Sequence, residues 1–191
     1  MTTTSTSTPI LLAQTLATTT TLLTAGTILS LSVFDSPLLA STARSTKSPL
    51  PSPASTLPAI RFIFSRGSHL IPQSATVASS LYLYLWYSSP SGVSNASVTL
   101  LARLLGVQIS QRTGYLIAAV LSASIMPMTG IMLPAANQRL RELAALEERG
   151  RGEEVDREEL KVMVQRFGWL NAIRGGLMAL GGLVGVVTLL G

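Results

Sequence analysis

Charge is confined to a few stretches of this chain, and that distribution constrains its fold more than any other feature. The 191 residues include fourteen Lys and Arg and nine Asp and Glu, and sixteen of these twenty-three lie between Arg139 and Arg174. A soluble domain needs charges of both signs spread over its surface. This chain lacks that spread, which excludes a typical water-soluble globular fold. The uncharged stretches are 1–34, 67–102, 113–138 and 175–191.

Four apolar segments approach the length that a membrane-spanning helix needs, about 20 residues for a hydrocarbon core of roughly 30 Å. Hydrophobic residues make up 47% of the chain and charged residues 12%. We therefore expect an all-α fold, an integral membrane four-helix bundle that forms a single membrane domain over 1–191. The expected spans lie at about 11–34, 70–87, 113–134 and 168–190.

The first predicted span has an alternative interpretation, and the second and third each contain a proline. The first is rich in Thr and has an alternative interpretation as a secretory signal peptide, although the preceding residues lack the basic character of such peptides. Pro72 lies near the start of the second span, where a first helical turn tolerates proline. Pro127 should bend or interrupt the third span, because proline removes a backbone donor and clashes with the preceding turn.

The connections between spans differ in composition. Residues 35–69 are rich in Ser, Thr and Pro, which predicts irregular structure. A short amphipathic helix is expected near the end of 88–112. Residues 135–167 hold most of the charge and predict two helices separated by a break at 149–152, the second running into the fourth span. Asp156 is expected to begin that second helix as part of a capping box.

The distribution of basic residues predicts the topology. Connections 35–69 and 135–167 contain eleven Lys and Arg, whereas the opposite side offers only Arg103 and Arg112. The positive-inside rule then places both termini on the lumenal side, and an endomembrane location is expected. The Asn95-Ala96-Ser97 sequon lies in the connection predicted to share that side.

Composition also excludes several kinds of chemistry. The chain has no cysteine, which removes disulfides, thiolate metal sites and cysteine nucleophiles. One histidine, His69, cannot make a multi-histidine metal site within one chain. The net charge of +5 does not indicate nucleic-acid binding, because the basic residues are not clustered with aromatic residues. No phosphate-binding, dinucleotide-binding or nucleophile-elbow motif is present.

Five polar residues near the ends of the spans are the candidates for function. If all four segments cross the membrane, these residues share one membrane face and can line one pocket. Arg174 and Asn171 are three residues apart and therefore neighbours on one helical face. An ionisable group within a span indicates a functional site, and the alternative is that Arg174 snorkels to the interface. The candidates are Asp35, His69, Asn137, Asn171 and Arg174.

The glycines of the fourth span allow close helix packing. Gly181 and Gly185 form a GxxxG pair, which lets helix backbones approach one another. The alternative is that a glycine-rich membrane helix contains such a pair by chance.

Two short patterns lie at the ends of the last two spans. Trp169-x-Asn171-x-x-Arg174 opens the last span, and Pro134-x-x-Asn137-x-x-Leu140 closes the third, with Thr129 before it. These patterns resemble the anthrone oxygenase family of small fungal membrane proteins. Characterised members of the family oxidise anthrones to anthraquinones in aromatic polyketide pathways, without a metal or flavin. The resemblance therefore implies a membrane monooxygenase whose partners are an anthrone, O₂ and the lipid bilayer, with no cofactor.

That chemistry suggests roles for four residues, as hypotheses. Arg174 would stabilise the oxyanion of the deprotonated anthrone, Asn171 and Asn137 would orient it, and His69 would be the base. His69 has alternatively the simpler role of an interfacial residue. A non-enzymatic four-span protein, an assembly partner or transporter subunit, is the competing interpretation, and a soluble secreted protein is a third.

Overall fold

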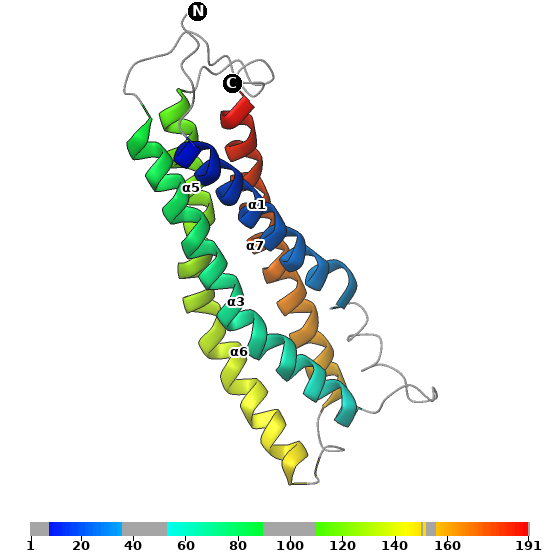
Figure 1. Cartoon of the computed structure of the whole chain (residues 1–191). Coiled ribbons are helices and arrows are strands. Elements are labelled where there is room, and N and C mark those ends of the chain that lie inside the picture. The colour runs from blue at the N-terminus through cyan, green and yellow to red at the C-terminus, as the bar shows by residue number, and fades with distance from the viewer. Residues whose placement is uncertain (1–7, 36–52, 90–109, 150, 152–155, 191) are drawn as a thin grey trace, which may run out of the picture. The chain divides into compact units, whose positions relative to one another are not determined.

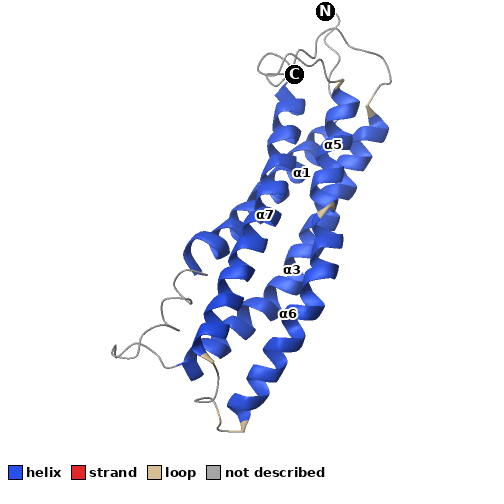
Figure 2. Ribbon diagram, turned by 180° about the vertical axis from the view of Figure 1, so that it is seen from behind, coloured by secondary structure: helices blue, strands red, loops and turns tan. Residues whose placement is uncertain are grey.

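The computed structural model describes residues 8–35, 53–89, 110–149, 151 and 156–190, and every element within these ranges is helical (Figures 1 and 2). The expected all-α fold is therefore confirmed for the described part of the chain. The sequon at Asn95 and the expected amphipathic helix before Gln108 lie outside the described residues. The elements are α1 (Thr8–Ser30), the π-helix η1 (Leu31–Asp35), α3 (Pro53–Ser88), α5 (Gln111–Ala123), α6 (Ile125–Glu148) and α7 (Arg157–Leu190).

Three of the described helical stretches are long and apolar enough to cross a membrane. They are Thr8–Phe34, Gln111–Ile131 and Glu158–Leu190, and they contain or overlap the expected first, third and fourth spans. The protein is thus an integral membrane protein by the length and composition of its helices. The expected second span, 70–87, lies within α3, whose many Ser and Tyr residues lower its hydropathy, and it stays a prediction.

Helix α3 begins earlier than the sequence suggested. It runs for 36 residues from Pro53, so the prediction of irregular structure is wrong for 53–69. Pro53 occupies the first helical position, where its missing N–H would have no intrahelical partner in any case. Pro72 lies in the interior of this helix, not in its first turn. Proline at such a position is tolerated in membrane helices because neighbouring groups compensate the freed carbonyl.

The predicted interruption of the third span by Pro127 is confirmed. Helix α5 ends at Ala123, and α6 begins at Ile125 after a single non-helical residue, Ser124. The Ser124 N–H still donates to the Val120 carbonyl at 2.9 Å, and its hydroxyl donates to the Leu121 carbonyl at 2.7 Å. Pro127 then falls in the first turn of α6, where a missing backbone donor costs least.

The charged connection between α6 and α7 is largely helical, as expected. Helix α6 continues beyond the third span to Glu148, and α7 starts at Arg157 and runs into the fourth span. Asp156 caps α7, because its carboxylate accepts a hydrogen bond from the Glu158 N–H at 2.9 Å. Asp156 is thereby confirmed as the start of the helix, but its bond goes to the second amide and not to the third as in a capping box, and the Glu159 carboxylate accepts from Arg139.

The helices contribute to two compact units, and each contains parts of α1, α3 and α7. The first unit adds α5 to these segments, and the second adds η1 and α6. The first unit comprises residues 1–26, 73–125 and 176–191, and the second comprises 27–72 and 126–175. The expectation of a single membrane domain concerns independent folding and stays a prediction.

Glycines of α7 allow close packing within the first unit. A Cβ on Gly181 would lie 3.1 Å from the Ser122 Oγ and 3.3 Å from the Ala118 carbonyl oxygen of α5. A Cβ on Gly185 would collide with the Tyr82 hydroxyl of α3. The Gly181–Gly185 pair therefore serves helix contacts inside this chain, which is the close approach that the GxxxG spacing indicated.

The Thr-rich composition of α1 is compatible with a membrane interior because its hydroxyls bond to the helix backbone. Thr18 donates to the Gln14 carbonyl at 2.8 Å, and Thr21 donates to the Ala17 carbonyl at 2.6 Å. Such bonds remove the cost of a hydroxyl that would otherwise lack a partner. The buried stripe of α1 therefore combines small apolar and hydroxyl side chains.

The second unit has an aliphatic core. Its buried apolar residues come from the end of α1, from α3, from α6 and from the first half of α7. Leu160 and Val164 are one turn apart on α7, and they continue along the helix toward the buried Asn171. The core residues are Ile28, Ile71, Leu143, Leu160 and Val164.

Candidate functional site

The candidate site is centred on two polar residues of α7 in the second unit. Asn171 and Arg174 are three residues apart, so their side chains meet on one face of the helix. The Arg174 Nη1 donates to the Asn171 Oδ1 at 3.1 Å. Asn171 is 1% exposed and Arg174 is 7% exposed. The structure therefore brings together the two residues that the sequence placed at the start of the fourth span.

Two further polar atoms of this pair are buried without a hydrogen-bond partner in the described part of the chain. They are the Asn171 Nδ2 and the Arg174 Nε. Both atoms are hydrogen-bond donors, and a guanidinium has no acceptor at all. A buried donor without a partner costs about 1–3 kcal/mol, and more when the group is charged. The site is therefore suited to a ligand that offers an acceptor oxygen, above all an anionic one.

The burial of Arg174 bears on the two interpretations of this residue. A snorkelling arginine keeps its charged head in water while its alkyl chain lies along apolar surface. Arg174 instead is 93% buried as a whole residue, and its guanidinium bonds inward to Asn171. This geometry favours the interpretation of Arg174 as a site residue.

The end of α1 packs against α7 directly beside this pair. A Cβ on Gly175 would lie 2.8 Å from the Leu29 Cγ and 3.2 Å from the Leu29 backbone nitrogen. Because glycine has no Cβ, the Leu29 side chain occupies that space. An aliphatic side chain of α1 therefore lies on the turn of α7 that carries Arg174.

The other residues predicted for the site have different placements. His69 lies on α3 in the second unit and is exposed. Asn137 lies on α6 in the same unit, and Asp35 ends η1, but the side chains of both are outside the described part of the structure. All five candidates belong to the second unit, and the structure shows contact between two of them, Asn171 and Arg174.

A comparison with protein-family models decides the family. The model for the anthrone oxygenase family matches residues 60–184, which is more than half of the chain. This chain belongs to the anthrone oxygenase family. The matched range includes Asn171, Arg174 and His69 and leaves out α1. Comparisons with curated proteins and with solved structures gave no match.

A second buried polar contact of this anthrone oxygenase family member lies in the first unit. The Gln14 Nε2 of α1 donates to the Tyr115 hydroxyl of α5 at 2.7 Å, and both residues are buried. The Tyr115 ring stacks on the Tyr82 ring, with centroids 6.4 Å apart. This cluster was not predicted from the sequence. The one indication of it there is Gln14, because a side-chain amide within an otherwise apolar and hydroxyl-rich span needs a hydrogen-bond partner.

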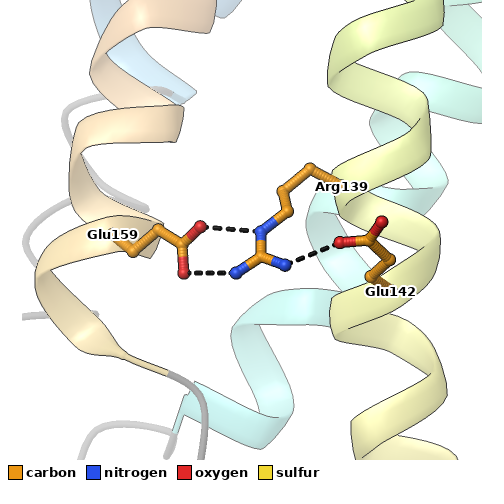
Figure 3. Close-up of polar contacts among 3 residues, drawn as sticks. All are labelled: Arg139, Glu142 and Glu159. Atoms are coloured by element: carbon orange, nitrogen blue, oxygen red, sulfur yellow. Dashed lines mark hydrogen bonds and ion pairs between the residues drawn. The ribbon is translucent and has the colours of Figure 1, made fainter.

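Charged residues join α6 to α7 outside the expected spans. Arg139 of α6 lies between Glu159 of α7 and Glu142 of α6, as Figure 3 shows. The hydrogen bonds that Arg139 donates to Glu159 and, to a lesser extent, to Glu142 hold the pKa of Arg139 above its usual range. Because these groups are exposed to solvent, the cluster is a surface contact between two helices of the second unit.

Proposed function

We propose that this protein is a cofactor-independent oxygenase that oxidises an anthrone to an anthraquinone. The observation that carries the proposal is the pair of buried donors on Asn171 and Arg174, which fall inside the range matched by the anthrone oxygenase family. A deprotonated anthrone carries negative charge on its ring oxygen. Buried donors that face such an oxygen stabilise it strongly, because water does not compete with them.

The reaction balances without an added reductant. A base removes one proton from the benzylic CH₂ of the anthrone, and the resulting delocalised anion transfers electrons to O₂. A C–O bond forms at that carbon to give a hydroperoxide, which takes up a proton. Loss of water breaks the O–O bond and the remaining C–H bond, and the carbonyl of the anthraquinone forms. One O₂ is reduced by four electrons, with one oxygen atom entering the product and the other leaving as water.

These steps need hydrogen-bond donors for the oxyanion, a residue that orients the ring system and a base. The Arg174 Nε and Asn171 Nδ2 donate to the anthrone oxygen as charge develops on it, and Asn137 helps to orient the ring system. His69 is the proposed base, because histidine is the side chain that most often transfers protons in general acid–base catalysis. Its exposure allows it to pass the proton to water.

The surroundings of the site suit an apolar aromatic substrate. An anthrone partitions into the bilayer, and the helices that would cross it present aliphatic side chains there. The proposal places the protein in aromatic polyketide biosynthesis. Both termini are proposed to lie on the lumenal side of an endomembrane, on the basis of the basic connections.

The test is oxygen uptake by membranes that contain the protein, with anthrone as the added substrate. Wild-type membranes should consume O₂ and form anthraquinone faster than spontaneous oxidation in membranes from cells that lack the protein. Arg174→Ala and His69→Ala should each lower this rate at unchanged expression. Arg166→Ala, an exposed arginine on the same helix, is the matched control and should retain activity. Full activity of both test variants would remove the site assignment, and no activity above background in the wild type would remove the proposed function.

The competing function is that of a non-enzymatic four-span protein, an assembly partner or transporter subunit. The buried amide of Asn171 weighs against it, because a scaffold gains nothing from an unpaired donor in its core. Asn171→Leu discriminates between the two. A scaffold should keep its partner interactions and stability in this variant, whereas the proposed enzyme should lose turnover.

A further inference from the structure

Helix α1 lies outside the range that the family model matches, yet it contacts α7 at the candidate site. Leu29 fills the space that a side chain would occupy at Gly175, with its Cγ 2.8 Å and its Cδ2 2.9 Å from an ideal Cβ position. The preceding residue, Ile28, is fully buried. This contact belongs to the second unit, as the Asn171–Arg174 pair does.

The contact with Gly175 places Leu29 against the turn of α7 that carries Asn171 and Arg174. Gly175 follows Arg174 directly, and it lies four residues after Asn171, which puts Asn171 and Gly175 on the same face of α7. A residue packed on Gly175 is therefore within one helical turn of the Asn171 backbone. The polar donors and the residue on which Leu29 packs therefore share one turn of α7.

We propose that Leu29 forms an apolar wall of the Asn171–Arg174 site and limits the size of the fused ring system that the site accepts. This inference rests on the proposed function. Aliphatic side chains discriminate between substrates by filling space, since they offer no directional bonds. Leu29 belongs to α1, which lies outside the range matched by the family model. A substitution there could change the size of substrate that the site accepts without changing the oxyanion donors on α7.

The chain contains a matched control for this proposal. Leu22 of α1 packs on Gly182 of α7 in the same manner, with its Cδ2 2.7 Å and its Cγ 2.9 Å from an ideal Cβ position. That contact lies in the first unit, seven residues earlier on α1 and seven residues later on α7. Truncation of Leu22 therefore removes a comparable leucine–glycine contact without changing the turn that carries Arg174.

The experiment compares kcat/KM for anthrone with kcat/KM for its linear four-ring homologue, in membranes that contain the full chain. Leu29→Ala should raise the four-ring to three-ring ratio at least about tenfold, the lower end of the discrimination that one methylene group provides in an apolar pocket. Leu22→Ala should leave the ratio within about twofold of the wild-type value. Leu29→Val provides a milder truncation if Leu29→Ala lowers expression, and it should shift the ratio in the same direction.

The outcomes separate this inference from the proposed function. If wild-type membranes oxidise anthrone and neither Leu29 variant changes the ratio, Leu29 is not a wall of the site and the inference is wrong. An equal change of the four-ring to three-ring ratio in the Leu29 and Leu22 variants would also overturn the inference, because it would indicate a general loss of packing between α1 and α7. If the wild type oxidises neither compound above the spontaneous rate, the proposed function fails first.

Discussion

Arg139 and Glu159 form a two-pronged ion pair between α6 and α7. The Nε and Nη2 of Arg139 each donate to a different Glu159 oxygen at 2.7 Å, and the Nη1 donates to Glu142 at 2.6 Å (Figure 3). This geometry joins the second half of α6 to the first turn of α7. The contact is solvent-exposed, so its strength should depend on ionic strength.

Arg139→Gln should lower the unfolding temperature of the detergent-solubilised protein slightly at low salt. The difference from the wild type should shrink as NaCl is raised, because salt screens the exposed charges that the wild type retains. Thermal unfolding curves at two salt concentrations measure both effects. Arg166→Gln is the control on α7. A salt-independent loss of stability would mean that Arg139 acts through packing of its alkyl chain instead.

Gly175→Ala should destabilise the protein. The added methyl group would meet the Leu29 Cγ at 2.8 Å and the Leu29 backbone nitrogen at 3.2 Å, so α1 would have to move. Overpacking of this kind typically costs about 1–3 kcal/mol. Gly176→Ala is the neighbouring control, since nothing lies within 4 Å of its ideal Cβ position, and alanine favours a helix by up to about 1 kcal/mol over glycine. Thermal unfolding should rank Gly176→Ala at or above the wild type and Gly175→Ala below it.

Gly185→Ala and Tyr82→Phe should show coupled effects on stability. A methyl group at Gly185 would collide with the Tyr82 hydroxyl and would also lie 2.7 Å from the ring Cζ. Removal of the hydroxyl relieves part of that collision. The unfolding temperature should therefore fall less when Gly185→Ala is made in the Tyr82→Phe background than in the wild type. Additive losses would show that the two residues do not contact each other in the folded protein.

The hydrogen bond between Gln14 and Tyr115 gives a prediction for α1. Tyr115→Phe and Gln14→Leu each remove one partner of the bond. The loss of unfolding free energy in the double variant should therefore be smaller than the sum of the losses in the two single variants. Hydrogen bonds between membrane helices contribute on average about 0.6 kcal/mol by this method, up to about 1.7 kcal/mol. The measurement is a double-mutant cycle on the free energy of unfolding in detergent. A coupling energy of zero would mean that Gln14 and Tyr115 do not form this hydrogen bond in the folded protein.

Much of the helical layout was predictable because lipid imposes strict requirements on sequence. A span must be long and almost uncharged, so the charge-free stretches indicated three described helices directly. The break before Pro127 was predictable too, since proline lacks the donor that a helix interior needs. The start of α3 at Pro53 was not predictable. Ser, Thr and Pro favour irregular structure locally, and long-range packing determines whether a helix forms there.

The candidate site was predictable only in part. The spacing of Asn171 and Arg174 predicted that they are neighbours on one helical face, and the structure confirms this and adds a hydrogen bond between their side chains. The contact of Leu29 with Gly175 and that of Gln14 with Tyr115 join residues far apart in sequence. Such pairings depend on the rotation of each helix about its axis. A nearly uniform apolar composition specifies that rotation weakly, because polar and apolar faces are not distinct.

We propose that Asn171 and Arg174 are held in the core for chemistry and not for stability. The most direct test is the double variant Asn171→Leu with Arg174→Met, measured for both anthrone turnover and unfolding temperature. Replacing both partners by apolar side chains of similar size should leave stability unchanged or raised. Turnover should fall by at least about 100-fold, the usual effect of removing an oxyanion donor. A stable double variant that still oxidises anthrone at the wild-type rate would contradict the claim.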